Sequence, residues 1–181
     1  MAFGRPRKVF TEEELYEYAV GALARRMRSV AELKRLLRNK VEANTEFGQT
    51  LVELIIVRLK NQGYLNDARY ATAFSSYRRD NEKFGRMRVV TDLKAKGVHG
   101  EVIEKAVSSV YEEVNEEKLA RAYLRRKRLQ KPADQKHVAR IFRQLLRAGF
   151  QSKTIFAILK KWEVDDETLT ALENESPEQA S

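Results

Sequence analysis

The sequence predicts an all-α protein in which three three-helix repeats follow one another along the chain. Apolar residues recur at spacings of three and four along most of the 181 residues, and only 3 prolines and 8 glycines interrupt them. A glycine-based helix stop recurs at Gly63, Gly97 and Gly149, and the last two lie 52 positions apart. No segment shows the alternation of a half-buried strand. We therefore expect nine helices and no strands.

The first repeat is expected to span residues 11–65, after a flexible basic arm formed by residues 1–10. Two capping boxes mark helix starts, Thr11 with Glu14 and Ser29 with Glu32, because each pair can satisfy two free backbone N–H groups. A single repeat is too short to bury its own apolar face, so neighbouring repeats should stack. The expected helices cover residues 11–26, 29–40 and 49–62, with a loop at residues 42–48.

The junction between the first two repeats is the most informative motif. The preceding helix carries an apolar stripe of Leu51, Leu54, Ile55 and Leu59. Gly63 lies where a helix end favours a left-handed residue, and Tyr64 or Leu65 can fold back onto the last turn. Asn66 or Asp67 can then cap the next helix. The predicted structural motif consists of Gly63, Tyr64, Leu65, Asp67, Tyr70, Ala71, Gly97 and Gly149.

The second and third repeats are expected at residues 66–112 and 113–162. A shift of 52 positions aligns Val89 with Ile141 and Gly97 with Gly149, so apolar residues meet apolar residues and glycine meets glycine. Asn115 and Asp134 are expected to cap helices of the third repeat. Residues 163–181 contain seven acidic residues and no Lys or Arg, and we expect at most two helical turns followed by a disordered tail.

Composition argues against catalysis. The chain has no cysteine, and its two histidines, His99 and His137, lie far apart in the sequence. No glycine-rich phosphate loop and no metal-ligand spacing is present, so we expect no catalytic residues, no metal and no cofactor. No apolar run approaches the length of a membrane span, and the N-terminus lacks a secretory signal, so we expect a cytoplasmic protein. A monomer is expected because the chain has no heptad seam.

Positive charge is the strongest functional signal. The chain has 35 basic and 26 acidic residues and a net charge of +9. Lys136, Arg140, Arg143 and Arg147 have the spacing of one helix face, which favours a polyanion or an acidic protein surface as partner. Cations near a helix end also gain about 0.3–1 kcal/mol from the macrodipole, which alone could account for Arg25 and Arg26. The candidate partner-binding or DNA-binding residues are Arg25, Arg26, Arg28, Lys34, Arg38, Arg78, Arg79, Arg86, Arg88, Arg125, Arg126, Arg128, Lys136, Arg140, Arg143 and Arg147.

These motifs resemble the RecX family of regulators of the RecA recombinase, over about residues 12–162. The resemblance rests on Leu23–Arg26 with Ser29–Leu33, on Gly63–Ala71, and on Gly85-Arg86 followed by Leu93–Val98. It implies an elongated, curved array of helix-turn-helix-like repeats. It also implies binding to the RecA nucleoprotein filament on single-stranded DNA, with restraint of its ATPase, strand-exchange and coprotease activities.

Two other functions stay open at this point. The chain could be a DNA-binding module whose basic faces contact the phosphates of single- or double-stranded DNA directly, in which case its affinity should fall steeply with salt. It could also be an enzyme, for which a turnover that depends on one carboxylate or histidine would be the evidence.

Overall fold

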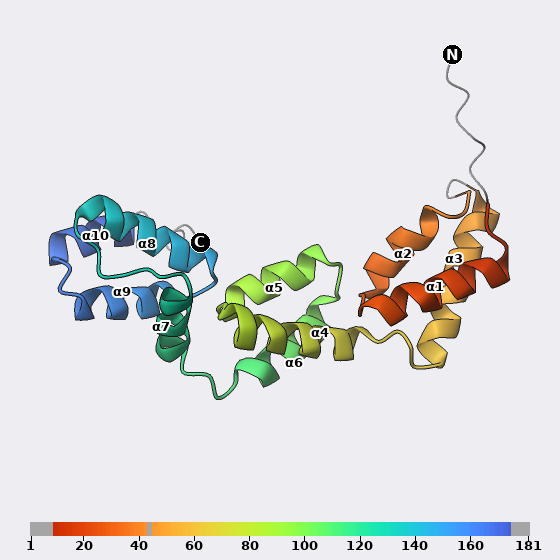
Figure 1. Cartoon of the computed structure of the whole chain (residues 1–181), viewed down its shortest axis with the longest axis horizontal. Coiled ribbons are helices and arrows are strands. Elements are labelled where there is room, and N and C mark those ends of the chain that lie inside the picture. The colour runs from red at the N-terminus through yellow and green to blue at the C-terminus, as the bar shows by residue number, and fades with distance from the viewer. Residues whose placement is uncertain (1–8, 43–44, 175–181) are drawn as a thin grey trace, which may run out of the picture. The chain divides into compact units, whose positions relative to one another are not determined.

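The computed structural model describes residues 9–42 and 45–174, and in these ranges the chain is all-α, without strands (Figure 1). The predicted fold class is confirmed, with ten α-helices instead of nine. They are α1 (Glu12–Arg25), α2 (Val30–Arg38), α3 (Glu46–Asn61), α4 (Asp67–Tyr77), α5 (Arg86–Ala95), α6 (Gly100–Tyr111), α7 (Glu116–Arg126), α8 (Gln135–Arg147), α9 (Ser152–Lys161) and α10 (Asp166–Asn174), with a π-helical turn, Arg78–Glu82, after α4.

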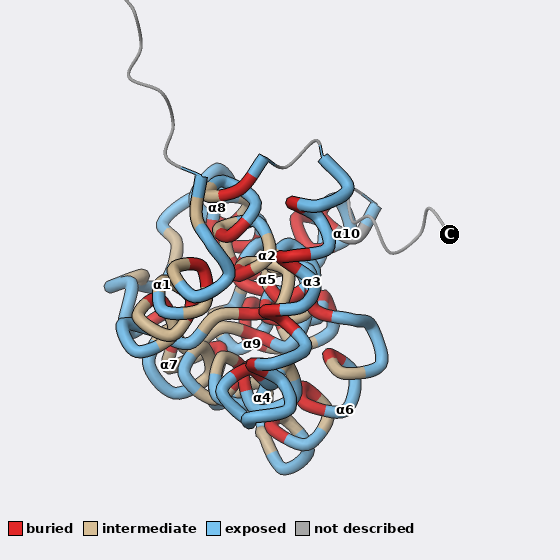
Figure 2. The backbone as a smooth tube through the Cα atoms, turned by 90° about the vertical axis from the view of Figure 1, so that its right-hand side faces the viewer, coloured by how far each residue is buried: buried red, intermediate tan, exposed pale blue. Residues whose placement is uncertain are grey.

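The chain divides into two compact units. The N-terminal unit contains the residues up to Ala71 together with Lys94–Val102, and the C-terminal unit contains Thr72–Leu93 and the residues from Ile103 onward. Buried and exposed positions alternate along the helices, as expected for helices that each bury one face (Figure 2). The boundaries predicted for the three repeats stay a prediction, because the second repeat contributes residues to both units.

In the N-terminal unit, α1, α2 and α3 pack around a common core in which Leu15, Leu33 and Ile55 are fully buried. Both predicted capping boxes are present, at Thr11 with Glu14 and at Ser29 with Glu32.

Two expectations about the N-terminal unit are wrong. Helix α3 begins at Glu46, inside the predicted loop, because the Thr45 side chain accepts a hydrogen bond from the N–H of Gly48 and so provides an earlier cap. Leu54, placed on the inward stripe, is 48% exposed.

The N-terminal arm, predicted to be flexible over residues 1–10, differs from this prediction at Phe10. Of the expected basic arm, residues 1–8 lie outside the described residues. Phe10 is held in place, because its N–H donates to the carbonyl of Lys40 at 3.1 Å and its ring meets that of Tyr18 edge-on.

The junction at Gly63 has the predicted geometry. Gly63, Gly97 and Gly149 all have left-handed backbones, with φ of 74°, 71° and 89°. The N–H groups of Tyr64 and Leu65 both donate to the carbonyl of Leu59, but only Leu65 folds onto the core. Asn66 provides the cap of α4, since its side chain accepts from the N–H of Arg69 at 2.9 Å.

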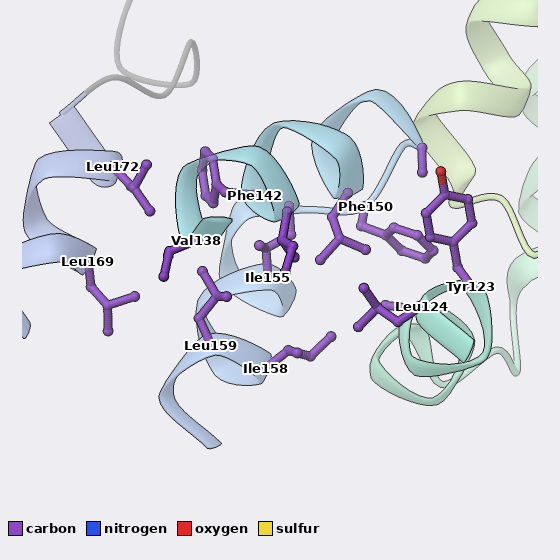
Figure 3. Packing of buried hydrophobic residues seen from close by; sticks show 14 residues of the cluster. Tyr123, Leu124, Val138, Phe142, Phe150, Ile155, Ile158, Leu159, Leu169 and Leu172 are labelled. Carbon is purple, nitrogen blue, oxygen red and sulfur yellow. The ribbon is translucent and has the colours of Figure 1, made fainter. Parts of the chain in front are cut away.

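In the C-terminal unit, α7, α8, α9 and α10 enclose a second core (Figure 3). Phe150 lies against Tyr123, with ring centroids 5.9 Å apart, and Ile155 and Leu159 fill the space beneath α8. The predicted caps at Asn115 and Asp134 are present.

The acidic tail expected from residue 163 is ordered over its first part. Asp165 caps α10 by accepting from the N–H of Thr168, and Leu169 and Leu172 are buried in the core (Figure 3). The expected one or two helical turns correspond to α10, which has nine residues and is anchored by these two apolar side chains. Residues 175–181 lie outside the described residues.

Each unit contains one joint in which the start of a helix packs directly on a glycine turn. In the C-terminal unit the start of α5 lies on the turn after α8: the N–H of Gly85 donates to the carbonyl of Ala148 at 2.8 Å, and the N–H of Met87 donates to Gly149 at 3.2 Å. The backbones are so close that a Cβ on Gly85 would lie 2.2 Å from the carbonyl oxygen of Gly149. A Cβ on Gly149 would lie 2.2 Å from the backbone nitrogen of Arg88.

The N-terminal unit has an equivalent joint between the start of α2 and the turn after α5. The hydroxyl of Ser29 donates to the carbonyl of Lys96 at 2.6 Å, and a Cβ on Gly97 would lie 2.5 Å from the Cβ of Ala31. Under the 52-residue shift Lys96 corresponds to Ala148, so the carbonyl that precedes the glycine is the acceptor in both joints. The N–H of Val30 donates a hydrogen bond to the carboxylate of Asp67, the first residue of α4, so α4 also supports this joint.

An ion pair closes the N-terminal joint. Lys96 Nζ lies 3.0 Å from Glu32 Oε1, and Arg26 lies 3.8 Å from the same oxygen. Burial by itself would raise the pKa of Glu32, but hydrogen bonds from Lys96 and from the N–H of Ser29, with the charges of Lys96 and Arg26, lower that pKa below its ordinary value. Burial, followed by the charge and hydrogen bond of Glu32, raises the pKa of Tyr70 to about 12.

Substitution of a joint glycine, Gly149, compared with substitution of Gly63, which belongs to no joint, tests the role of the close approach. Alanine at Gly63 meets no atom within 4 Å, so Gly63→Ala should cost only the left-handed backbone penalty, about 1–2 kcal/mol. Gly149→Ala carries the same penalty and also collides with the backbone at Arg88, which should add about 1–3 kcal/mol. Urea unfolding followed by circular dichroism measures both values. Equal losses of unfolding free energy would show that the close approach is unimportant.

The Glu32 ion pair predicts a pH-dependent contribution to stability. Because the folded-state pKa of Glu32 is lowered, its contribution should be complete above the ordinary value near 4.5 and should disappear as the pH falls through the lower folded value. We therefore expect the difference in unfolding free energy between wild type and Glu32→Gln to shrink between about pH 5 and pH 3. Glu104→Gln, at an exposed position of α6, is the control and should show no such trend.

Candidate functional site

The two histidines belong to no group of side chains that could hold a metal ion among the described residues. No group of three metal-ligating side chains is found in this part of the chain. His137 Nδ1 lies 3.0 Å from Asp134 Oδ2, at the start of α8. The backbone N–H of His137 lowers the pKa of Asp134 by hydrogen bonding to it, which makes the pair part of the helix cap. None of the described helices is long and apolar enough to cross a membrane.

The basic face predicted on α8 is exposed. Val138, Ile141, Phe142 and Leu145 bury one side of the helix. The other side carries Lys136, Arg140, Arg143 and Arg147, all exposed. Arg143 also borders a shallow groove of about 250 Å³ that it shares with Glu167 and Ala171 of α10.

Three of these cations are available to a partner. The side chains of Lys136, Arg140 and Arg147 make no ion pair with any carboxylate in the described part of the chain. A row of unpaired cations along the length of a helix exceeds what the macrodipole at its last turn can stabilise. This face can therefore attract phosphate groups or acidic side chains.

The end of α7 adds further positive charge. Arg125, Arg126 and Arg128 are exposed, and Arg128 adopts a left-handed backbone, with φ of 55°. Arg126 lies 3.2 Å from Glu82 and so has part of its charge compensated. Arg125 and Arg128 are not paired within the described residues.

Arg78 and Arg79 serve internal contacts. The guanidinium of Arg78 lies over the rings of Phe74 and Phe84, 5.0 and 5.3 Å from their centroids, and donates to Asp92 at 2.9 Å. Arg79 donates to the carbonyl of Val110 at 2.6 Å, which anchors the π-helical turn. The structure thus gives these predicted binding residues a positioning task inside the C-terminal unit.

Arg86 and Arg88, at the start of α5, are exposed but engaged. Arg86 donates to the hydroxyl of Ser108 at 2.9 Å. Arg88 pairs with Asp92 at 3.0 Å and reaches the carbonyl of Arg147, which places it at the joint on the glycine turn.

Some basic residues of the N-terminal unit are paired and others are not. Arg25 and Arg38 are exposed, without ion pairs among the described residues. Arg26 contributes to the Glu32 cluster, Arg28 donates to the carbonyl of Ala22 at 3.4 Å, and Lys34 pairs with Glu53 at 2.7 Å. The α8 stripe is therefore the largest set of predicted residues that one helix presents together. Sequence reasoning could not separate it from the paired arginines, because several of their partners, such as Glu82 for Arg126, lie more than ten positions away in the chain.

Comparison with known proteins gives a consistent result. The family described as "RecX, second three-helix domain" matches residues 66–107. A protein named Regulatory protein RecX from Myxococcus xanthus (strain DK1622) is 33% identical over 169 residues, 87% of each chain. Its namesake from Pseudomonas putida (strain W619) is 32% identical over 149 residues, 82% of this chain and 90% of the relative. Another relative, from Bacillus pumilus (strain SAFR-032), is longer, and the chain spans 54% of its length.

Solved structures agree on the fold. The crystal structure of RecX from Lactobacillus salivarius superposes with a TM-score of 0.66 over 84% of this chain and 96% of that chain, at 19% identity. A second structure, of regulatory protein RecX, gives a TM-score of 0.60 at 22% identity, over 83% of this chain and 73% of the other. The relatives are similar in sequence over most of the chain and the solved structures have the same helical architecture. The chain therefore belongs to the RecX family of regulatory proteins.

Proposed function

We propose that the chain is a non-enzymatic regulator that binds the RecA filament on single-stranded DNA and restrains its ATPase, strand-exchange and coprotease activities. The observation that carries the proposal is the exposed basic face of α8, on which Lys136, Arg140 and Arg147 form no ion pair within the described residues, in a member of this family. A nucleoprotein filament presents a dense row of phosphates, and exposed cations at one-turn spacing are suited to such a target.

A second candidate is direct binding to DNA without RecA. It is favoured by the same observation, because Lys136, Arg140 and Arg147 would contact phosphates whether or not a filament surrounds them. The two functions differ in the concentration at which they act. A filament regulator acts below the level needed to coat bare DNA, whereas a competitor for DNA acts only at saturation.

The first prediction concerns RecA activity. Titration of this chain into the single-stranded-DNA-dependent ATPase of RecA should inhibit hydrolysis at concentrations that leave the same DNA without RecA largely unbound. Fluorescence anisotropy of labelled DNA measures binding to the bare strand. Inhibition that begins only where bare DNA is saturated would favour direct DNA binding, and no inhibition at stoichiometric levels would refute the proposal.

The second prediction concerns the α8 face. The triple change Lys136→Glu, Arg140→Glu and Arg147→Glu should weaken binding to single-stranded DNA by about tenfold or more at low salt. It should also reduce the slope of log affinity against log salt by about 2, because each cation that no longer neutralises a phosphate of a single strand lowers the slope by about 0.7. The helical signal should remain, because all three side chains are exposed.

A matched control separates the α8 face from net charge. The triple change Arg35→Glu, Lys60→Glu and Lys105→Glu alters the charge by the same amount at exposed positions on other helices. If both triple variants lose affinity equally, the effect comes from the overall charge of the chain, and α8 has no special part in binding.

A further inference from the structure

Helix α3 has a second apolar face that the core does not use. Phe47, Leu54 and Val57 are 76%, 48% and 52% exposed, although Ile55 and Leu59 on another side of the helix are buried. Spacings of seven and three place the exposed residues on one side of the helix. Phe47 is the most exposed of the large apolar side chains in the described residues.

The exposed face continues into a groove against the start of α1, within the N-terminal unit. The groove has a volume of about 190 Å³ and is lined by Phe10, Thr11 and Glu12 on one side and by Phe47, Thr50, Leu51 and Leu54 on the other. Its lining is mostly apolar, and it is large enough for one or two apolar side chains of a partner.

The walls of the groove are held by specific contacts. Gly48 allows the first turn of α3 to lie against the carbonyl of Glu42, since a Cβ there would be 2.3 Å from that oxygen. The Thr45 cap fixes the same turn, and the N–H of Phe10 donates to the carbonyl of Lys40. Because Phe47 follows a fixed helix start, the groove is preorganised, and binding there loses little conformational entropy.

Acidic residues accompany this groove and form what we call its acidic edge, although the chain as a whole has a net charge of +9. Glu12 is part of the lining, Glu13 follows it in the sequence, Glu46 precedes Phe47, and the backbone carbonyl of Glu42 lies against the first turn of α3. Glu12, Glu13, Glu42 and Glu46 are exposed, and none of them forms an ion pair within the described ranges. Three of them lie in the first turn of a helix, where the macrodipole stabilises a carboxylate, but Glu42 lies outside a helix. The edge disfavours phosphate and favours cations, which is the reverse of the α8 face.

We propose that this groove binds a protein segment in which a large apolar side chain is flanked by Lys or Arg. The apolar side chain enters between α1 and α3 and covers Phe47 and Leu54, and the flanking cations face the carboxylates at the edge. The identity of the partner rests on the function proposed above: the segment belongs to the protein component of the filament. The chain then uses separate surfaces for protein and for phosphate.

Peptide binding tests the chemistry of the groove without RecA. The probe is a fluorescein-labelled hexapeptide with Phe-Leu at its centre and two lysines on each side, and its counterpart has two glutamates on each side. Anisotropy should show that the lysine peptide binds at least about tenfold more tightly than the glutamate peptide. Phe47→Ser with Leu54→Ser should abolish this binding, and Tyr77→Ser with Met87→Ser, at residues 57% and 56% exposed elsewhere, should leave it unchanged.

Equal binding of the two peptides, or binding that survives the Phe47 and Leu54 changes, would overturn the proposal. Two further experiments test other occupants of the groove. The first is peptide binding after deletion of residues 1–8, and the second is sedimentation of the full chain. Much tighter peptide binding after the deletion would assign the groove to that segment of the chain. A concentration-dependent dimer that Phe47→Ser disrupts would assign it to a second copy. Either result would refute a partner segment as the occupant.

The filament assay tests the identity of the partner. The Phe47→Ser, Leu54→Ser variant should need at least about tenfold more protein for half-inhibition of the RecA ATPase, with unchanged affinity for bare single-stranded DNA. Inhibition equal to wild type would show that the groove does not bind the filament, while the function proposed for the chain would stand. If wild type itself fails to inhibit, the proposed function fails, and the peptide result still decides the groove.

Discussion

The structure depends on a close backbone approach that only glycine permits. At both joints a helix start lies on a left-handed glycine turn, and the carbonyl before that glycine accepts a hydrogen bond from the incoming segment. A single Cβ on Gly85 or Gly149 would come within 2.2 Å of backbone atoms. Backbone cannot move aside as a flexible side chain can, so the glycines determine how one helix start meets the next turn. The two cores then fill the space around these joints.

The local part of this arrangement could be predicted from sequence, and the long-range part could not. The left-handed glycines, the caps at Thr11, Ser29 and Asp134, and the fold-back at Gly63 all follow from interactions between residues a few positions apart. The joints connect segments that are far apart in the chain, so nothing near Gly85 in sequence indicated its contact with Gly149. The cap at Thr45 was missed because its signal was weak compared with the surrounding polar residues.

The same distinction applies to the candidate site. The spacing of Lys136, Arg140, Arg143 and Arg147 was sufficient to predict a shared face, because a helix fixes their relation. Sequence could not show that Arg78 lies between two aromatic rings or that Arg126 meets Glu82. Much of the positive charge elsewhere is engaged in such internal pairs, whereas Lys136, Arg140 and Arg147 of α8 form no ion pair within the described residues and share one helix face. The acidic edge of the α1–α3 groove was hidden in the same way by the overall charge of the chain.

The joints also determine which kinds of sequence change the fold tolerates. The C-terminal joint is held by hydrogen bonds between backbone groups, and the N-terminal joint needs few side chains, chiefly Ser29 and Asp67. The rest of the helix surfaces can therefore diverge during evolution as long as these residues and a few glycines remain. A surface that diverges without loss of the scaffold can become adapted to a different partner in each lineage. The architecture is consequently more durable than any one of its binding faces, and distant relatives should share joints before they share contact residues.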